Sequence, residues 1–268
     1  LRLMMYGYGN MISPSNRLFS GGGGFDPYAQ TFITTASITD GTQQDAINQL
    51  VLDLKSYSIW SKLEAIYPYV GGNATAHSYN LKDTSAFQIT WNGGVTHDAN
   101  GITGNGTNGY GDTGFVTNTV LSNFISMGVY SRTTAISNSI EIGTYSTTGY
   151  DFMLIYRSAS GFHSFASDKT GYYRTVTDGL GLFAMNRTSD TVTQSYVNGV
   201  EGVHATTRTG YSINNIYVLA RNFSGTSTDL YSPRNLSFAF IGNSLTTTEQ
   251  ANLNTAILDF QTTLSRNV

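Results

Sequence analysis

The acidic side chains of this 268-residue chain are too few and too scattered to form the carboxylate pair that glycoside hydrolysis needs. That reaction requires two carboxylates a few ångströms apart, one as general acid and one as nucleophile or base. The chain has four glutamates, Glu64, Glu141, Glu201 and Glu249, and two of them fall in segments expected to be helical. Glu141 lies in an expected strand, but the residues that follow it bring no second carboxylate to that strand. The sequence therefore predicts no catalytic residues and a protein that is not an enzyme.

The histidines and glycines show no spacing typical of a metal or phosphate site. The four histidines, His77, His97, His163 and His204, form no H-x-x-x-H or E-x-x-H pair, and we expect His163 and His204 on strand faces. The chain has no cysteine, which excludes disulfides and thiolate ligands. Ser/His/Asp triads arise by chance in any Ser-rich chain, but the G-x-S-x-G elbow is absent, as is the phosphate-binding G-x-x-x-x-G-K-[ST] motif. We predict no cofactor, with calcium as the one ion left open.

Calcium is left open because one Gly- and Asn-rich stretch, residues 100–112, carries oxygen ligands. It is expected to be a long surface loop. Asp98, Asn100, Asn105 and Asp112 would supply the carboxylate and amide oxygens that Ca²⁺ prefers. Solvated turn residues explain the same pattern equally well, so both interpretations stand.

The same stretch also offers side chains suited to sugar binding. Tyr110 would supply a ring to stack on a pyranose, because tyrosine combines an apolar face with a polar tip. Asn108 and Asp112 would satisfy the sugar hydroxyls. Tyr172 and Tyr173 form a second candidate pair. For each of these residues a turn or packing role is the alternative interpretation.

The composition is typical of a sheet-rich protein with one sizeable core. Eighteen tyrosines and 14 phenylalanines beside 29 glycines favour many short strands, and hydrophobic residues make up 40% of the chain. The net charge of −3 and the lack of a Lys/Arg run argue against a nucleic-acid partner. The sequence contains no run of about 18 apolar residues, so no membrane span is predicted. The first residues lack the sustained apolar region of a signal peptide, so none is expected.

Residues 1–25 are expected to form an N-terminal arm, separate from a single domain over residues 26–268. The glycines and Pro14 in this stretch exclude a long regular element. Two interpretations of the arm remain open: a disordered terminus, or a segment that docks on a partner subunit. The second would hide the large apolar side chains of the arm from water: Met4, Met5, Tyr6, Tyr8, Leu18 and Phe19.

Helical periodicity occurs at both ends of the domain. Residues 42–66 are expected to be helical from an N-cap at Thr42, with an apolar stripe of Ile47, Leu50, Val51 and Leu54 and a weaker continuation from 59 to 66. Near the C-terminus Thr246 and Glu249 match a capping box. The apolar face that follows, Leu253, Ala256, Ile257, Phe260 and Leu264, predicts a helix lying on the outside of the sheets.

Between the helices the period changes to two, which indicates β-strands. Strands are expected at residues 77–81, 86–91, 124–133, 139–144, 150–157, 161–167, 171–177, 204–206, 215–221 and 236–241, and in a hairpin over 182–200. Short strands separated by Gly-, Asn- and Thr-rich turns favour a two-sheet sandwich or jelly roll over a βαβ fold.

The hairpin over residues 182–200 shows the pattern most clearly. Phe183 and Met185 alternate with Ala184 and Asn186, so one set is expected in a core and the other toward solvent. Asn198-Gly199 tolerates the positive φ angles of a type I′ turn.

Six segments in a fixed order resemble a known family. They are VGGNATAHSYNLKD (70–83), NGTNGYGDT (105–113), VYSRT (129–133), SYVNGV (195–200), IYVLARNFSGT (216–226) and SFAFIGNSLTTTEQANLNTAILDFQTTLSR (237–266). From about residue 25 to the C-terminus the chain resembles bacteriophage virion-associated proteins with a concanavalin A-like, laminin G-type jelly roll. Jelly-roll glucanases carry E-x-D-x-x-E on one strand, and this chain lacks that motif.

The resemblance implies a concanavalin A-like two-sheet jelly roll with one helical segment at its N-terminal side and one C-terminal helix. It also implies a place on the virion exterior as a capsid, fibre or tail component, among other copies of itself and other virion proteins. Our first hypothesis is accordingly a non-enzymatic virion structural protein. The alternative is a lectin-like carbohydrate-binding module for adhesion to a host or to mucus, and the two roles are compatible.

Overall fold

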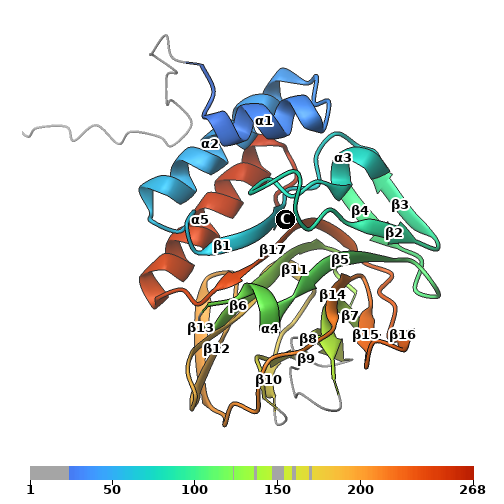
Figure 1. Cartoon of the computed structure of the whole chain (residues 1–268), viewed down its shortest axis with the longest axis vertical. Coiled ribbons are helices and arrows are strands. Elements are labelled where there is room, and N and C mark those ends of the chain that lie inside the picture. The colour runs from blue at the N-terminus through green and yellow to red at the C-terminus, as the bar shows by residue number, and fades with distance from the viewer. Residues whose placement is uncertain (1–23, 123, 136–137, 147–153, 159–160, 169–170) are drawn as a thin grey trace, which may run out of the picture.

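Two β-sheets and a layer of helices make up the part of the chain that can be described. The computed structural model describes residues 24–122, 124–135, 138–146, 154–158, 161–168 and 171–268. Within these ranges the sheets lie face to face, and helices cover the outer face of one of them (Figure 1). The predicted fold class, a jelly-roll sandwich with peripheral helices, is confirmed.

The sheet under the helices, sheet A, has eight strands among the described residues. Seven follow one another as β13 (Val200–Ala205), β12 (Val192–Val197), β11 (Leu180–Ser189), β6 (Ile125–Arg132), β17 (Asn235–Asn243), β4 (Gly101–Gly104) and β3 (Val95–Asp98). The eighth, β1 (Leu63–Tyr67), also pairs with β17. All of these pairs are antiparallel.

The second sheet, sheet B, has nine strands among the described residues. Seven follow one another as β10 (Tyr172–Thr175), β9 (Gly161–Phe165), β8 (Leu154–Ser158), β7 (Ser139–Tyr145), β14 (Asn215–Val218), β5 (Tyr110–Val116) and β2 (Thr90–Asn92). β15 (Arg221–Phe223) pairs with β7, and β16 (Ser227–Asp229) pairs with β15.

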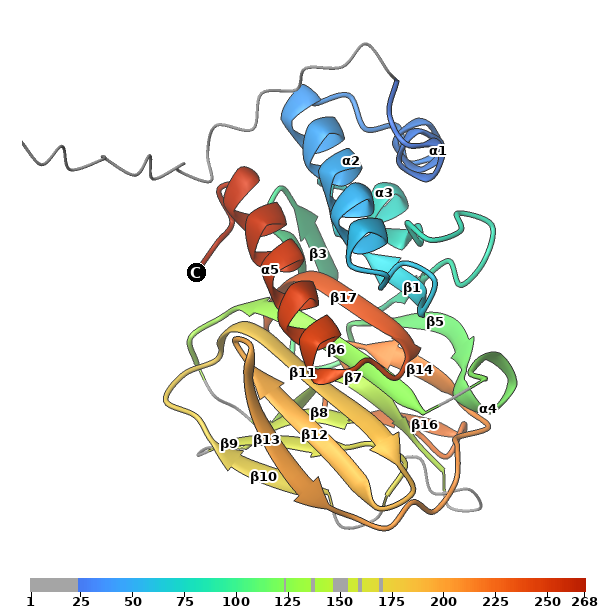
Figure 2. The same ribbon diagram turned by 90° about the vertical axis from the view of Figure 1, so that its left-hand side faces the viewer.

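Helices α2 (Gly41–Ser56) and α5 (Thr247–Thr263) lie across the outer face of sheet A, and α1 (Pro27–Thr35) packs on α2 (Figure 2). Two short helices, α3 (Ala74–Ser78) and α4 (Thr117–Val120), lie near the ends of strands. The predicted capping box is confirmed, because Thr246 and Glu249 bond each other's backbone at the start of α5. Leu253, Ala256, Ile257 and Phe260 are buried as predicted, and Leu264, at the C-cap, is partly buried.

The central strands of sheet A, β6, β11 and β17, are buried on both faces, which explains one wrong prediction. Phe183 and Met185 point into the core between the two sheets, whereas Ala184 packs beneath the helices. Asn186, expected toward solvent, is also buried and donates to the carbonyl oxygen of Leu245 at 2.7 Å. Alternation along this strand therefore separates two cores rather than a core from water. The type I′ turn is confirmed, with φ of 50° at Asn198 and 77° at Gly199.

The helix predicted over 42–66 is wrong in its second half and at its cap. The side chain of Asp40, not Thr42, accepts from the backbone of Gln43 at 2.8 Å, so α2 begins at Gly41. The helix ends at Ser56, and Ser58 has a positive φ of 60°. Residues 63–67 then pair with β17 as β1, because the apolar residues of this segment complete the two cores.

Two further predictions between residues 77 and 112 are wrong. Residues 77–81 do not form a strand, because the side chain of Asn73 caps α3 by accepting from Ala76 at 2.9 Å. Residues 100–112 are not one long loop, because they hold β4 and the start of β5. The predicted N-terminal arm, with its six apolar side chains, lies outside the described residues apart from Gly24 and Phe25. Phe25 packs against the helical core.

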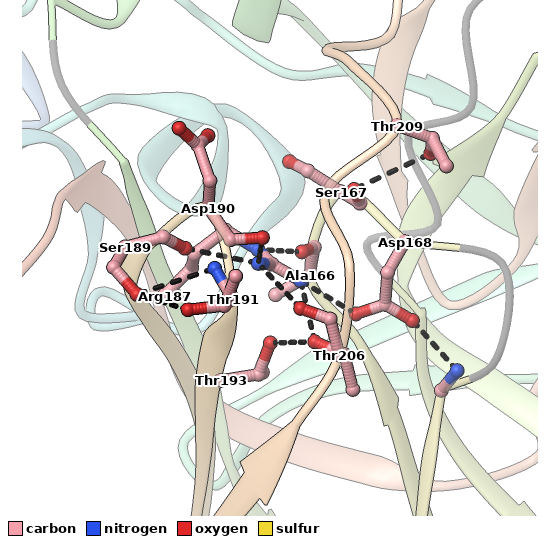
Figure 3. Close-up of polar contacts among 11 residues, drawn as sticks. Ala166, Ser167, Asp168, Arg187, Ser189, Asp190, Thr191, Thr193, Thr206 and Thr209 are labelled. Atoms are coloured by element: carbon pink, nitrogen blue, oxygen red, sulfur yellow. Dashed lines mark hydrogen bonds and ion pairs between the residues drawn. The ribbon is translucent and has the colours of Figure 1, made fainter.

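A buried ion pair joins the two sheets (Figure 3). The guanidinium of Arg187, on β11, donates to a carboxylate oxygen of Asp168, which follows β9, at 2.9 Å. Its remaining N–H groups bond Ala166, Ser189, Asp190 and Thr206. Both side chains are essentially excluded from solvent. Burial lowers the pKa of Arg187, and the adjacent Asp168 opposes that shift.

We expect Arg187→Met to lower the free energy of unfolding by about 3–5 kcal/mol, because it leaves the carboxylate of Asp168 buried without its partner. Urea denaturation followed by circular dichroism measures this loss. Asp190→Asn is the control: its side chain is 74% exposed in an ion pair with Arg208, and it should cost no more than about 1 kcal/mol. Equal losses in the two variants would contradict the conclusion that the buried ion pair stabilises the fold more than the exposed one does.

Candidate functional site

The outer face of sheet B carries the most chemically suggestive group of side chains. No helix of the described chain packs across this face as α2 and α5 do on sheet A (Figure 1). Along β14, Ile216 and Val218 point into the core, so Asn215 and Tyr217 point outward. Along β5, Phe115 points inward, and Tyr110 and Asp112 point outward and are partly exposed.

Three tyrosines from separate segments meet on this face. The rings of Tyr110 and Tyr217 are stacked, with centroids 4.7 Å apart and planes 28° apart. Tyr231 lies in the segment between β16 and β17. The centroid of its ring is 6.3 Å from that of Tyr110, and the two ring planes are 51° apart. All three are partly exposed. We call these three residues the tyrosine platform.

The loop before β5 fixes the position of Tyr110. The side-chain oxygen of Asn105 accepts from the backbone N–H groups of Thr107, Asn108 and Gly109, each at 3.0 Å. Gly111 follows Tyr110 and must be glycine, because a Cβ there would lie 2.5 Å from Ile89 and 2.7 Å from Trp91. The sequence thus holds Tyr110 on a rigid strand end rather than on a free loop.

Asp112 and Asn215 form a polar pair beside the platform. The side-chain amide nitrogen of Asn215 donates to the two carboxylate oxygens of Asp112, at 3.0 and 3.1 Å. The backbone N–H of Gly114 donates to the same carboxylate at 2.9 Å. Tyr217 lies opposite Asp112 in the sheet. Burial first, and then the charge of Asp112, raise the pKa of Tyr217 to about 12, so its hydroxyl is protonated at neutral pH.

The structure thus brings together two of the three residues predicted to contact a glycan, Tyr110 and Asp112. The third, Asn108, lies in the adjoining loop, where its side-chain oxygen accepts from Gly94 at 3.1 Å and from Asn105 at 2.7 Å. This bonding agrees with the turn interpretation of Asn108. Sequence reasoning missed Asn215, Tyr217 and Tyr231. The alternation in 215–218 places the first two on one face, but nothing local predicts that β14 pairs with β5.

The second predicted pair, Tyr172 and Tyr173, lies on β10 at the edge of sheet B, on the far side of the sandwich from β2 and β3. Tyr172 stacks on His204 and Tyr173 packs edge-on against His163, at 36% and 41% exposure. His163 and His204 lie on strands β9 and β13, as predicted. The two tyrosines point to opposite sides of one strand and form no joint surface.

The four oxygen ligands predicted for calcium do not converge. Asp98 and Asn100 lie at the turn between β3 and β4, whereas Asn105 lies past the other end of that hairpin, beyond the four residues of β4, which span about 13 Å. Asp112 is in the other sheet and is bonded to Asn215. Among the described residues, no cluster of three or more His, Asp or Glu side chains is arranged to hold a metal ion.

The remaining polar features fit structural roles. Glu141, the acidic residue considered for hydrolysis, is fully buried in an ion pair with Arg234. Two hollows of about 220 and 490 Å³ lie beside α5, and neither is lined by an aromatic ring.

In the part of the chain that the structure describes, no helix has the length and apolarity to cross a bilayer.

A histidine pair joins α3 to β3. The Nδ1 atoms of His77 and His97 lie 3.1 Å apart, so one ring donates and the other accepts, and both are neutral. Trp91 packs edge-on against His97 at 4.7 Å. Burial is the main cause that lowers the pKa of His77 to about 3, with smaller contributions from His97 and Arg266. We assign this pair to stability rather than to ligand binding.

Comparison with known proteins supports the fold. No family model matches the chain, and no curated protein matches it significantly. It is similar to the binding domain of Paraclostridial Mosquitocidal Protein 1, with a TM-score of 0.50, 9% identity, and coverage of 73% of this chain and 52% of that one. This likeness shows a shared sandwich fold and no more.

Two further solved structures have lower TM-scores. Domain 4 of AbnA, an extracellular GH43 arabinanase from Geobacillus stearothermophilus in complex with arabinotriose, has a TM-score of 0.46 and 17% identity, covering 72% of this chain and 98% of that one. The sialidase of Trypanosoma rangeli in complex with 2,3-difluorosialic acid has a TM-score of 0.48 and 9% identity, covering 79% and 39%. The chain thus spans well under two thirds of the sialidase and of the mosquitocidal protein chain.

The histidine pair predicts a loss of stability in mild acid. Folding lowers the pKa of His77 from 6.5 to about 3. The contribution of His77 to the free energy of unfolding is therefore complete above pH 6.5 and falls as the pH drops below that value. At pH 5 the loss is about 2 kcal/mol from His77. Urea denaturation at pH 7.5, 6 and 5 should show the loss, and His77→Phe should reduce it by about that amount, leaving the part that comes from other histidines such as His204, whose pKa burial lowers to about 4. An equal loss in both proteins would contradict the assignment.

Proposed function

We propose that this chain is a lectin-like carbohydrate-binding module whose site is the tyrosine platform together with Asp112 and Asn215. The observation that carries the proposal is the meeting of three tyrosines from three segments beside a carboxylate and an amide, on the face of sheet B that helices leave uncovered.

The chemistry of the platform suits a sugar. Carbon-bound hydrogens on one face of a pyranose pack on an aromatic ring, and tyrosine adds a hydroxyl that can bond to the sugar's own hydroxyls. The carboxylate of Asp112 and the amide oxygen of Asn215 can accept from other hydroxyls. Because Tyr110 and Tyr217 hold each other in place, little side-chain entropy is lost when a ligand binds.

The proposed role is adhesion without turnover. A hydrolase would need a pair of accessible carboxylates, and the platform has Asp112 as its one acidic side chain among the described residues, since Glu141 is buried against Arg234. We therefore extend the sequence-based expectation of a non-enzymatic protein to this site.

Attachment to a phage virion is the second part of the proposal, and its support is the motif resemblance alone. A module on the virion exterior, held by other copies of itself and by other virion proteins, would present the outer face of sheet B to surface glycans. Deleting residues 1–23 tests the predicted docking arm, and normal incorporation of the truncated protein into particles would contradict it.

The direct test of the proposed function is a glycan array on the purified protein, followed by calorimetry with the strongest ligand. We expect Tyr217→Ala to weaken binding by at least about 30-fold, because truncating a central aromatic anchor typically costs 2 kcal/mol or more. Tyr217→Phe keeps the ring and should lose far less. Circular dichroism would confirm that the variants fold.

Tyr172→Ala is the matched control, since it removes a partly exposed tyrosine from the other side of the sandwich. It should leave the affinity unchanged. An array on which the wild-type protein binds no saccharide would contradict the proposed function, as would binding that survives Tyr217→Ala but is lost in Tyr172→Ala.

A further inference from the structure

We infer that the site formed by the tyrosine platform, Asp112 and Asn215 selects uncharged saccharides and rejects those that carry a carboxylate or a sulfate, because the one charged side chain among these residues is the carboxylate of Asp112, which can only accept hydrogen bonds. The inference deepens the proposed function and rests on it. It concerns the class of glycan, which the presence of a platform does not by itself define.

The hydrogen-bonding pattern of the Asp112–Asn215 pair fixes which atoms a ligand meets. A carboxylate can only accept, so the atom of Asn215 that lies 3.0 and 3.1 Å from the two oxygens of Asp112 must be its nitrogen. The amide oxygen of Asn215 is thereby turned away from Asp112. One N–H of Asn215 is shared between the two carboxylate oxygens, and the backbone N–H of Gly114 donates to one of them, so the carboxylate keeps acceptor capacity toward a ligand.

What a hydroxyl donor meets on this pair is the remaining acceptor capacity of the carboxylate and the amide oxygen of Asn215. Sugar hydroxyls can donate to both. A carboxylate or sulfate on a ligand has no proton to donate at neutral pH, so it would place acceptor against acceptor. The donors at the site are the tyrosine hydroxyls and the second N–H of the Asn215 amide, and neutral sugars can use these equally well.

The charges around the platform agree with this selectivity. Burial raises the pKa of Tyr217 most, and the groups that add to this rise, Asp112, Tyr110 and Tyr231, include no cation. Arg221 and Arg234, the described cations nearest in sequence to Tyr217 and Tyr231, are each paired with a carboxylate. Arg221 binds Asp229 at 2.5 Å, and Arg234 binds the buried Glu141.

The expected discrimination follows from the distance between like charges. Two negative charges about 5 Å apart at a partly exposed site repel each other enough to reduce affinity roughly tenfold. Salt should weaken this effect, because exposed charges are screened over about 10 Å at 0.1 M ionic strength. Stacking on the tyrosine rings should change little over the same range.

The test uses pairs of saccharides in which one member carries an added acidic group or acidic sugar, such as N-acetyllactosamine with its sulfated form and lactose with 3′-sialyllactose, within a broader array of neutral and acidic glycans. We expect the wild-type protein to bind neutral members at least tenfold more tightly than their acidic partners. Raising sodium chloride from 0.05 to 0.5 M should narrow that ratio. Equal binding of both members at low salt would overturn the inference.

Two variants locate the effect. Asp112→Asn removes the charge and should reduce the neutral-to-acidic ratio to near one. The double variant Asp112→Asn with Asn215→Asp moves the carboxylate across to β14, where an amide can still donate to it, and should restore the ratio. An unchanged ratio in Asp112→Asn would overturn the inference. If that variant does not fold, the salt dependence of the wild-type protein decides the question.

The outcomes separate the two proposals. A wild-type protein that binds no saccharide contradicts the proposed function and the inference with it. A protein that binds neutral and acidic members equally, and loses both in Tyr217→Ala, keeps the proposed function and contradicts the inference alone.

Discussion

The burial of sheet A on both faces is the constraint on which the rest of this structure depends. Its inner face packs on sheet B through side chains such as Phe183 and Ile241, and its outer face packs under α2 and α5 through Phe238 and Phe240. Each fully buried side chain of this size contributes about 1.5–3 kcal/mol. The inner faces of the two sheets pack on each other, so the outer face of sheet B is the one face that, among the described residues, neither a helix layer nor the other sheet covers (Figure 2).

That asymmetry explains why tyrosines gather where they do. A tyrosine on either face of sheet A must find a partner for its hydroxyl in a dry environment, as Tyr130 does with the side chain of Asn267. On the outer face of sheet B the hydroxyl can reach solvent while the ring packs on its neighbours. Tyr110, Tyr217 and Tyr231 are therefore stable there without a ligand, and they remain accessible to one.

The sequence predicted the elements whose signals are local. The capping box at Thr246, the apolar face of α5 and the turn at Asn198-Gly199 each depend on a few neighbouring residues, and each is confirmed. The predictions failed where distant residues decide. The apolar residues from 59 to 66 fit a helix, yet they form β1 because β17 offers a partner nearly 180 residues later. The alternation of the 182–200 hairpin could not reveal that helices cover its second face.

The candidate site shows the same division. Tyr110 and Asp112 are two residues apart on one strand, so their shared face could be predicted from the sequence. Asn215, Tyr217 and Tyr231 join them through the pairing of β5 with β14 and through the segment after β16, and no sequence period encodes those contacts. Asn108 was grouped with Tyr110 by proximity in the chain, but its side chain serves the loop.

The measurement that tests the central claim most directly is a nuclear magnetic resonance titration of protein labelled with ¹³C in its tyrosine rings, using a neutral saccharide that binds on the array. The account predicts that the ring signals of Tyr110, Tyr217 and Tyr231 shift together with one saturation curve, while those of Tyr172 and Tyr173 stay in place. Shifts confined to Tyr172 and Tyr173, with the platform signals unmoved, would contradict it.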